Sequence, residues 1–399
     1  MSDTRPEVAF LFNHDAPHQV AHTALIISAM LEIDPDVRIS VLSSTAEQEE
    51  RARHLLPQAE ARISFIRLKR GAAARMVRFA ALGFAPLRRA ALLFDSRKLL
   101  DGFDAIIVPE TTTALLRTHF WVKRPALIYL PHGAGDRAVG FRAVTSAFDL
   151  VLLAGEKVRD RMLEAKIIRA DGHAIVGYPK FDTVDLTSKP ALFPDGKPVV
   201  LYNPHFDPRL SSWWQAGVAV LDWFAGQDRY NLVFAPHVML FRKQLHASVE
   251  HRQLRLRRSI PKRFRGLANL LIDPGSTRSV DMSYTLGADI YLGDASSQVY
   301  EFLVRPRPCI FLNPGRLAWR GDPNFAHWNL GQVIESVEEL PGALERAPLL
   351  QAAYEPLQRQ AFAATFSLTG TSSSVRAAQA ILDWISAHDH PEPAFPQSG

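Results

Sequence analysis

Short runs of apolar residues recur along the first half of the chain, without the polar–apolar alternation of a strand that has one wet face. Amphipathic or loop segments separate most of these runs. Strands that are apolar on both faces belong to covered parallel sheets in α/β proteins. We expect a helix over Val20–Ile33 and strands at Val8–Asn13, Arg38–Leu42, Ile63–Leu68, Asp104–Val108, Ala126–Leu130, Asp149–Leu153 and Ala174–Val176.

The pattern stops in a proline-rich stretch, 179–197, and then starts again. The second series predicts helices at Trp213–Phe224, Val280–Leu286 and Ser296–Leu303, and strands at Pro198–Tyr202, Asn231–Ala235, Ala268–Ile272, Asp289–Leu292 and Cys309–Leu312. A chain of 399 residues also exceeds the usual size of a single hydrophobic core. Two doubly wound domains in succession, joined by one linker, are the plan of the GT-B fold.

We therefore expect an α/β protein of GT-B type, with two doubly wound Rossmann-like domains facing each other across a cleft that holds the active site. The expected parts are an acceptor-side domain (1–178), a linker (179–197), a nucleotide-donor domain (198–370) and a C-terminal helix and tail (371–399) that cross back. The segment after the first strand, Phe12–Pro17, contains no glycine. A single dinucleotide-binding enzyme would need a glycine-rich turn there.

Composition narrows the class of protein further. The chain is 47% hydrophobic and 22% charged, as expected for a globular protein. Its one cysteine, Cys309, excludes a disulfide framework and a cysteine-rich metal site. We find no apolar run long enough for a bilayer and no signal-peptide pattern at the start, so we expect a cytoplasmic protein.

The net charge of +5 is concentrated in two stretches, 67–98 and 252–265. Positive clusters suit phosphorylated substrates, nucleic acid or an anionic membrane. The stretch 70–100 interleaves arginines with apolar residues, as a basic amphipathic helix on a bilayer does. The alternative is a surface helix with solvated arginines. The stretch has no Tyr or Trp to stack on bases, which disfavours nucleic acid.

Three histidines follow expected strands, where doubly wound sheets bind their ligands. Pro131-His132-Gly133 offers a histidine with the ordinary pKa of a general base, although a tight turn explains the motif equally well. Pro204-His205 and Pro236-His237 both follow strands of the second domain. Such histidines can bind phosphates and offset the charge of a leaving group. Taken alone, His205 fits a loop histidine facing water better.

The densest group of polar residues lies at 294–301. Ser296 and Ser297 open a helix after a strand that ends at Asp294, an arrangement that suits a phosphate. Glu301 lies one helical turn beyond Ser297, within reach of a ribose. Helix capping explains one such residue, but it does not explain why four polar residues occur together: Asp294, Ser296, Ser297 and Glu301.

These residues resemble the C-terminal signature of the CDP-glycerol glycerophosphotransferases, the teichoic-acid polymerase family. The matching positions are Asp281, Ala288-Asp289-Ile290, Asp294-Ala295-Ser296-Ser297 and Glu301. Pro131-His132-Gly133 resembles the family's His-Gly-Thr-Pro motif, whose histidine is regarded as the base. Ala235-Pro236-His237 resembles its second histidine. The resemblance spans about residues 104–312.

The chain also departs from the family's pattern. The family's Gly-Thr-Pro-Leu-Lys is here Gly133-Ala134-Gly135-Asp136-Arg137, which loses the threonine and leaves a basic residue at the end. The family's final acid is usually Asp, whereas Glu301 is the form found in UDP-GlcNAc 2-epimerases. The identity of the donor is therefore open among CDP-glycerol, another CDP-alditol and a nucleotide sugar.

The resemblance implies an enzyme, and we expect it to need neither a cofactor nor a metal. It would transfer a glycerophosphate-like or glycosyl group from a nucleotide-diphosphate donor to a hydroxyl of a lipid- or polymer-linked acceptor, in cell-envelope synthesis. The arginine-rich stretch 70–100 leads us to expect that it works at the inner face of the cytoplasmic membrane. The expected catalytic residues are His132 and His237. The expected donor-binding residues are His205, Arg278, Asp281, Asp294, Ser296, Ser297 and Glu301, and the acceptor-side residues are His14, Gly133 and Arg137.

Two other functions remain open. An isomerase resembling the sugar-nucleotide 2-epimerases would need acidic residues beside the sugar, and a non-catalytic subunit would bind nucleotide without turnover. A zinc site from His14, His18 and His22 is disfavoured, because Pro17 marks the first turn of the helix and leaves two aligned histidines.

Overall fold

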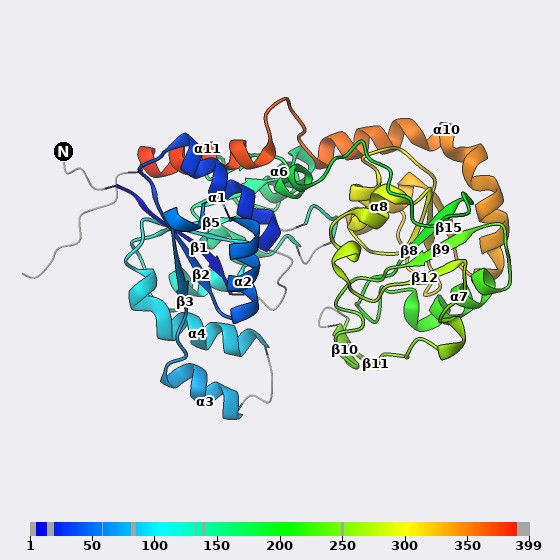
Figure 1. Ribbon diagram of the computed structural model, residues 1–399, viewed down its shortest axis with the longest axis horizontal. Helices are drawn as coiled ribbons and strands as arrows, with labels where there is room; N and C mark the ends of the chain where they lie inside the picture. The colour runs from blue at the N-terminus through cyan, green and yellow to red at the C-terminus, as the bar shows by residue number, and fades with distance from the viewer. Residues whose placement is uncertain are drawn as a thin grey trace, which may run out of the picture. The chain divides into compact units, whose positions relative to one another are not determined.

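The computed structural model describes residues 5–13, 20–57, 59–80, 85–131, 133–137, 140–248 and 251–388. The chain forms two compact units, each with its own parallel sheet (Figure 1). Unit 1 comprises Met1–His132, Phe141–Thr183 and Thr365–Gly399, and unit 2 comprises Gly133–Gly140 and Val184–Ala364. In the described part of the chain, no helix combines the length and hydrophobicity needed to cross a bilayer.

The sheet of unit 1 has seven parallel strands in the order β3-β2-β1-β4-β5-β6-β7. The strands are β1 (Glu7–Phe12), β2 (Arg38–Ser43), β3 (Ile63–Arg67), β4 (Ala105–Val108), β5 (Ala126–Tyr129), β6 (Leu150–Leu153) and β7 (His173–Ile175). This order reverses direction between β1 and β4, as in a Rossmann fold.

Helices cover both faces of this sheet, which explains the continuous apolar runs. Along β1, Val8, Phe10 and Phe12 pack with one cluster of buried residues, while Ala9 and Leu11 pack with another. The first face is covered by α1 (Ala21–Ile33), α2 (Ala46–Leu55) and α11 (Ser373–Ala387), and the second by α4 (Ala85–Leu100), α5 (Leu115–Thr118) and α6 (Glu156–Glu164). Figure 1 shows α11, at the end of the chain, beside α1.

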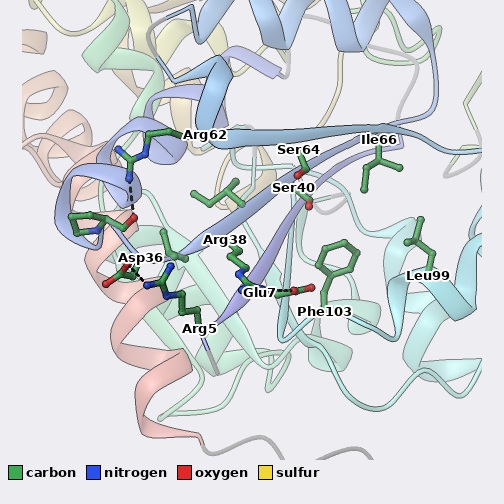
Figure 2. A pocket seen from close by; sticks show the side chains of 13 residues that line it. Arg5, Glu7, Asp36, Arg38, Ser40, Arg62, Ser64, Ile66, Leu99 and Phe103 are labelled. Atoms are coloured by element: carbon green, nitrogen blue, oxygen red, sulfur yellow. Dashed lines mark hydrogen bonds and ion pairs between the residues drawn. The ribbon is translucent and has the colours of Figure 1, made fainter. Parts of the chain in front are cut away.

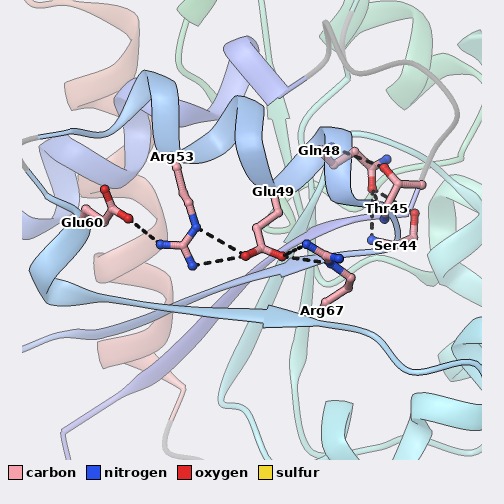
Figure 3. A network of polar contacts seen from close by, with 7 residues as sticks. All are labelled: Ser44, Thr45, Gln48, Glu49, Arg53, Glu60 and Arg67. Carbon is pink, nitrogen blue, oxygen red and sulfur yellow. Dashed lines mark hydrogen bonds and ion pairs between the residues drawn. The ribbon is translucent and has the colours of Figure 1, made fainter.

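The N-terminus of α2 is fixed by a capping box between Thr45 and Gln48 (Figure 3). One turn on, Glu49 accepts hydrogen bonds from Arg67 at the end of β3 (2.8 Å) and from Arg53 (3.1 Å). Partial burial raises the pKa of Glu49, but the hydrogen bonds from the two arginines outweigh it and hold the pKa below its usual value. This network joins α2 to the edge of the sheet.

The sheet of unit 2 has six parallel strands in the order β12-β9-β8-β13-β14-β15. They are β8 (Val199–Asn203), β9 (Asn231–Phe234), β12 (Leu270–Ile272), β13 (Ile290–Gly293), β14 (Cys309–Leu312) and β15 (Gln332–Ile334). The helices are α7 (Val218–Ala225) after a π-helical turn (Trp213–Gly217), α8 (Ser283–Gly287), α9 (Gln298–Phe302) and α10 (Leu340–Thr365). An antiparallel hairpin, β10 (Leu245–Ser248) and β11 (Gln253–Leu256), completes unit 2.

The predicted fold class is confirmed: each unit is a doubly wound, Rossmann-like parallel sheet. Every strand expected from the apolar runs is present. The sequence reasoning missed β10, β11 and β15, which are short and not apolar throughout. The helix α11 lies within the segment expected to hold the C-terminal helix, 371–399, and Thr365 is the first residue of the segment that groups with unit 1.

Candidate functional site

The strongest candidate site in unit 2 lies at the carboxyl ends of β8 and β13. These neighbouring parallel strands mark the point where the strand order reverses. Helices leave the sheet in opposite directions at such a point, so a crevice opens outside the strand ends, and ligands bind there. Here β8 leads into Pro204-His205, and β13 leads into Asp294 and the two serines.

Asp294 joins these two strand ends. One carboxylate oxygen accepts hydrogen bonds from the backbone amides of His205 (2.8 Å) and Ala295 (2.6 Å). The other accepts the amide (2.6 Å) and hydroxyl (2.8 Å) of Ser212, beside the turn that precedes α7. Because the side chain is fully buried and its oxygens are engaged within the protein, Asp294 holds the loops rather than facing a ligand.

His205 and His237 repeat the same local geometry at the ends of β8 and β9. The ring Nδ1 of His205 accepts the backbone N–H of Asp207 (3.0 Å), and Nδ1 of His237 accepts that of Met239 (3.2 Å). In a neutral ring this leaves the hydrogen on Nε2. The two rings lie 5.5 Å apart between centroids, so the strand ends present a pair of Nε2–H donors.

Burial lowers the pKa of His205 well below 6.5, and the neighbouring basic groups His237, Arg137 and His327 act in the same direction. The His205 ring is therefore neutral near pH 7. An anion placed among these groups would reverse the effect of the neighbouring charges, so it would favour a cationic ring. We therefore expect a bound anion to raise the pKa of His205.

Ser296 and Ser297 differ in accessibility. Ser296 is buried, and its hydroxyl accepts the amide of Gln298 (3.4 Å), whereas Ser297 is exposed at the start of α9. The loop that follows β5 lies against this point: a Cβ on Gly135 would come within 2.7 Å of the Cβ of Ser297. Gly135 is needed for that close approach. Gly133 and Arg137 belong to the same loop, which groups with unit 2 rather than with the N-terminal unit.

A buried ion pair that the sequence reasoning missed anchors this loop. Asp136 Oδ2 accepts hydrogen bonds from the hydroxyl of Tyr300 (2.7 Å) and from the amide (3.0 Å) and Nδ1 (2.9 Å) of His327. The other ring nitrogen of His327 lies 2.9 Å from the carbonyl oxygen of Asp294, which only accepts. Both ring nitrogens therefore carry hydrogens, and His327 is a cation beside the Asp136 carboxylate. Asp136 already stood in the quoted motif, but nothing local in the sequence marks its partner.

Arg307 links the ends of α8 and α9. Its partly buried guanidinium donates to the carbonyl of Thr285 (2.8 Å) and to those of Ala288 and Phe302, and lies over the ring of Phe302. Burial lowers the pKa of Arg307 to about 9. These bonds satisfy carbonyls at the ends of α8 and α9, which lack partners within their helices.

The remaining predicted donor residues are spread around the same edge of the sheet. Glu301 is buried on α9. Arg278 is exposed, with its guanidinium 5.0 Å from the centre of the Tyr284 ring. Asp281 accepts the amide (2.9 Å) and hydroxyl (2.6 Å) of Ser283, the first residue of α8.

In unit 1, the corresponding reversal point lies between β1 and β4. The predicted residues His14 and His132 lie outside the described residues. Just beyond the carboxyl end of β4 lies Glu110, a buried acid that the sequence reasoning missed; an acid two residues after an apolar strand was the available signal. Burial raises the pKa of Glu110, although hydrogen bonds from Thr113 and Thr112 oppose the effect.

Unit 1 also has a hollow of about 620 Å³ at the amino ends of β1 and β2 (Figure 2). Its charged side chains are engaged with one another or with backbone: Arg5 pairs with Asp36 (3.0 Å) and Arg38 with Glu7 (3.2 Å), while Arg62 donates to backbone carbonyls. Parallel sheets bind ligands at the opposite edge, and none of the predicted site residues lines this hollow.

No protein-family model matches the chain, and no curated protein matches it in sequence. Solved structures do match in fold. The wall teichoic acid polymerase TagF, solved with CDPG, is 15% identical with a TM-score of 0.57, covering 96% of this chain and 88% of that one. MnaA of S. aureus, solved with UDP, is 13% identical with a TM-score of 0.59, covering 97% and 99%.

UDP-GlcNAc 2-epimerase from Neisseria meningitidis, solved with UDP-GlcNAc, is 11% identical with a TM-score of 0.58, covering 96% of this chain and all of that one. At these identities the likeness is one of fold. The predicted resemblance is therefore confirmed at that level: the chain has the two-domain GT-B fold, which it shares with a teichoic acid polymerase and with a UDP-GlcNAc 2-epimerase.

Proposed function

We propose that this protein is a transferase that moves a glycerophosphate-like or glycosyl group from a nucleotide-diphosphate donor to a hydroxyl of a lipid- or polymer-linked acceptor. The observation that carries the proposal is the pair of imidazoles, His205 and His237, held at the strand-order reversal of unit 2 beside Ser296 and Ser297. Imidazole N–H donors suit a pyrophosphate leaving group, whose charge grows in the transition state.

In this proposal the pyrophosphate lies across the ends of β8, β9 and β13. The Nε2–H groups of His205 and His237 and the hydroxyl of Ser297 donate to it, and Glu301 and Arg278 lie toward the nucleoside. Proteins of the same fold have been solved with CDPG, with UDP and with UDP-GlcNAc, which supports a nucleotide-diphosphate ligand. CDP-glycerol is the donor that the sequence resemblance favours.

His132 is the proposed base that deprotonates the acceptor hydroxyl. It follows β5, and the loop after it is the one that the Asp136–His327 pair holds against Ser297. That attachment supports a role for the loop at the donor site. His14, Gly133 and Arg137 are proposed to line the acceptor side.

The stretch 70–100 of unit 1, which we call the basic insert, is the basis for proposing a lipid- or polymer-linked acceptor. Asp95, on α4, accepts the amides of Ala73 (3.2 Å) and Ala74 (2.9 Å) and so caps α3 (Ala72–Ala80). The insert also exposes large apolar side chains on both helices, among them Met76 and Leu87. Exposed apolar groups among arginines suit an anionic bilayer. We propose that this protein works at such a surface.

An isomerase of the 2-epimerase kind is the second candidate, and Glu110 favours it. A buried acid with a raised pKa at the carboxyl end of β4 is a group that can exchange protons with a sugar. The two functions separate in one assay. An isomerase converts a nucleotide sugar with no acceptor present, whereas a transferase requires one. A non-catalytic subunit would bind nucleotide and do neither.

Calorimetric titration with CDP and with UDP tests the donor site. The wild type should bind at least one of the two, and Ser296→Ala/Ser297→Ala should bind it more weakly. Equal affinity of the wild type and the double variant would rule out the assignment of the two serines. Ser259→Ala, an exposed serine of the same unit, is the control.

A further inference from the structure

The β10–β11 hairpin of unit 2 exposes its leucines and buries polar side chains, the reverse of the usual arrangement at a protein surface. Leu245, Leu254 and Leu256 are 55%, 69% and 72% exposed, whereas His246 and Ser248 are 6% and 1% exposed. A strand on a protein surface normally turns its apolar face inward. Here the polar face is inward and the leucines point to solvent.

The pairing register gathers the exposed apolar residues into one patch. Leu245 lies opposite Leu256, and Ala247 lies opposite Leu254, on the same face of the hairpin. Directly opposed side chains in a hairpin are in contact range of each other. These four residues, the leucine face, therefore form a continuous apolar surface.

The inverted register is held by the buried side. The Nε2 of His246 lies 2.9 Å from the carbonyl oxygen of Leu240 and 3.1 Å from that of Lys243, and its ring lies edge-on to Trp214. A slip by one residue would bury the leucines and expose these polar groups. Because the polar residues have specific partners inside unit 2, the leucines are kept outside.

The surroundings of the leucine face are strongly cationic. Between Arg242 and Arg265 the sequence has nine basic residues and one acid, Glu250. Lys243, Arg252 and Arg258 are exposed next to the two strands. Arg257 lies over the ring of Phe241 and donates to the carbonyl of Lys243, so it braces the base of the hairpin.

We propose that the leucine face binds the surface of an anionic lipid bilayer, with the leucines in the interface and the basic residues at the headgroups. Leucines among lysines and arginines are the composition of interfacial segments. A second copy of this chain would bring two clusters of the same charge together. Single-stranded nucleic acid requires stacking rings, and the leucine face has none. This inference concerns a surface other than the basic insert, and it does not depend on the nucleotide site.

A fluorescent label at the hairpin tests the proposal directly. Cys309, the only cysteine, is buried, so Leu254→Cys can be labelled selectively with a polarity-sensitive dye. Leu349→Cys is the matched control, because Leu349 is an exposed leucine of unit 2 on α10. With vesicles of equal parts phosphatidylcholine and phosphatidylglycerol, emission from position 254 should shift to the blue, and emission from 349 should not. The same response at both positions, or none at 254, overturns the proposal.

Vesicle sedimentation separates this surface from the insert of unit 1. In a background with Arg75→Ser and Arg88→Ser, we expect residual binding to these vesicles. The further change Leu254→Ser/Leu256→Ser should reduce it roughly tenfold or more, while Leu349→Ser leaves it unchanged. Binding that survives the double change contradicts the proposal, as does a leucine-dependent dimer in light scattering. Nucleotide titration of the same variants should match the parent, so failure of the donor site and failure of the leucine face give different results.

Discussion

The carboxylate of Asp294 accepts a hydrogen bond from the backbone amide of His205 at 2.8 Å. This contact joins the ends of two adjacent parallel strands, β8 and β13, across the point where the strand order of unit 2 reverses. The imidazole that we assign to the donor is therefore positioned by the strand that also carries the two serines.

Replacing Asp294 by asparagine should destabilise unit 2. The amide nitrogen would face backbone N–H groups, donor against donor, whichever way the side chain is turned. We expect a loss of about 3 kcal/mol in the free energy of unfolding, since charged hydrogen bonds are broken in a buried place. Denaturant unfolding of Asp294→Asn measures this loss, and Asp228→Asn, at an exposed position, is the control. Equal unfolding midpoints for Asp294→Asn and the wild type would contradict the role of Asp294.

The lowered pKa of His205 predicts an acid-dependent loss of stability. As the pH falls below 6.5, the unfolded chain binds a proton at this histidine while the folded protein does not, so stability decreases toward the folded pKa. His205→Gln should remove this part of the pH dependence. Unfolding midpoints at a series of pH values test it, and a slope that is unchanged in the variant would show that the histidine does not contribute.

The same shift predicts proton uptake on ligand binding. A pyrophosphate next to His205 raises the pKa of the ring, so binding at a pH just below 6.5 should draw protons from the buffer. Titration calorimetry in two buffers of different ionisation enthalpy measures the number of protons. Uptake should be smaller in His205→Gln, and equal uptake would place the titrating group elsewhere.

The Asp136–His327 pair is expected to order the loop after His132. Tyr300→Phe removes one hydrogen bond to Asp136 and should cost about 1 kcal/mol, whereas Asp136→Asn leaves a buried cation without its partner and should cost about 3 kcal/mol or more. Hydrogen exchange at the amides of Gly135 and Arg137 should rise in that order. A greater effect from Tyr300→Phe would contradict the ion pair.

Much of the fold could be predicted from local pattern, because strands covered on both faces are apolar throughout. The positions of Asp294 and His205 just after such strands could also be predicted, but the strand order that makes β8 and β13 neighbours could not. The Asp136–His327 pair could not be predicted: its members lie 191 residues apart, and only the folded chain brings a loop of each together. The β10–β11 hairpin was missed because its pattern places leucines outside, against the rule used to find strands.

Removal of the proposed base should stop the chemistry without weakening donor binding. With a suitable donor and acceptor, His132→Ala should lower turnover by roughly 10²–10⁴-fold, as is typical when a general base is lost. Nucleotide affinity measured in parallel should stay at the wild-type value. Near-full turnover by the variant would assign the base elsewhere.

A crystal structure with bound CDP or UDP would show directly whether the donor pyrophosphate lies at the reversal point of unit 2. We expect phosphate oxygens within hydrogen-bonding distance of Nε2 of His205 and of His237, and against Ser297. Nucleotide density in unit 1 alone, or diphosphate density away from both imidazoles, would contradict this expectation.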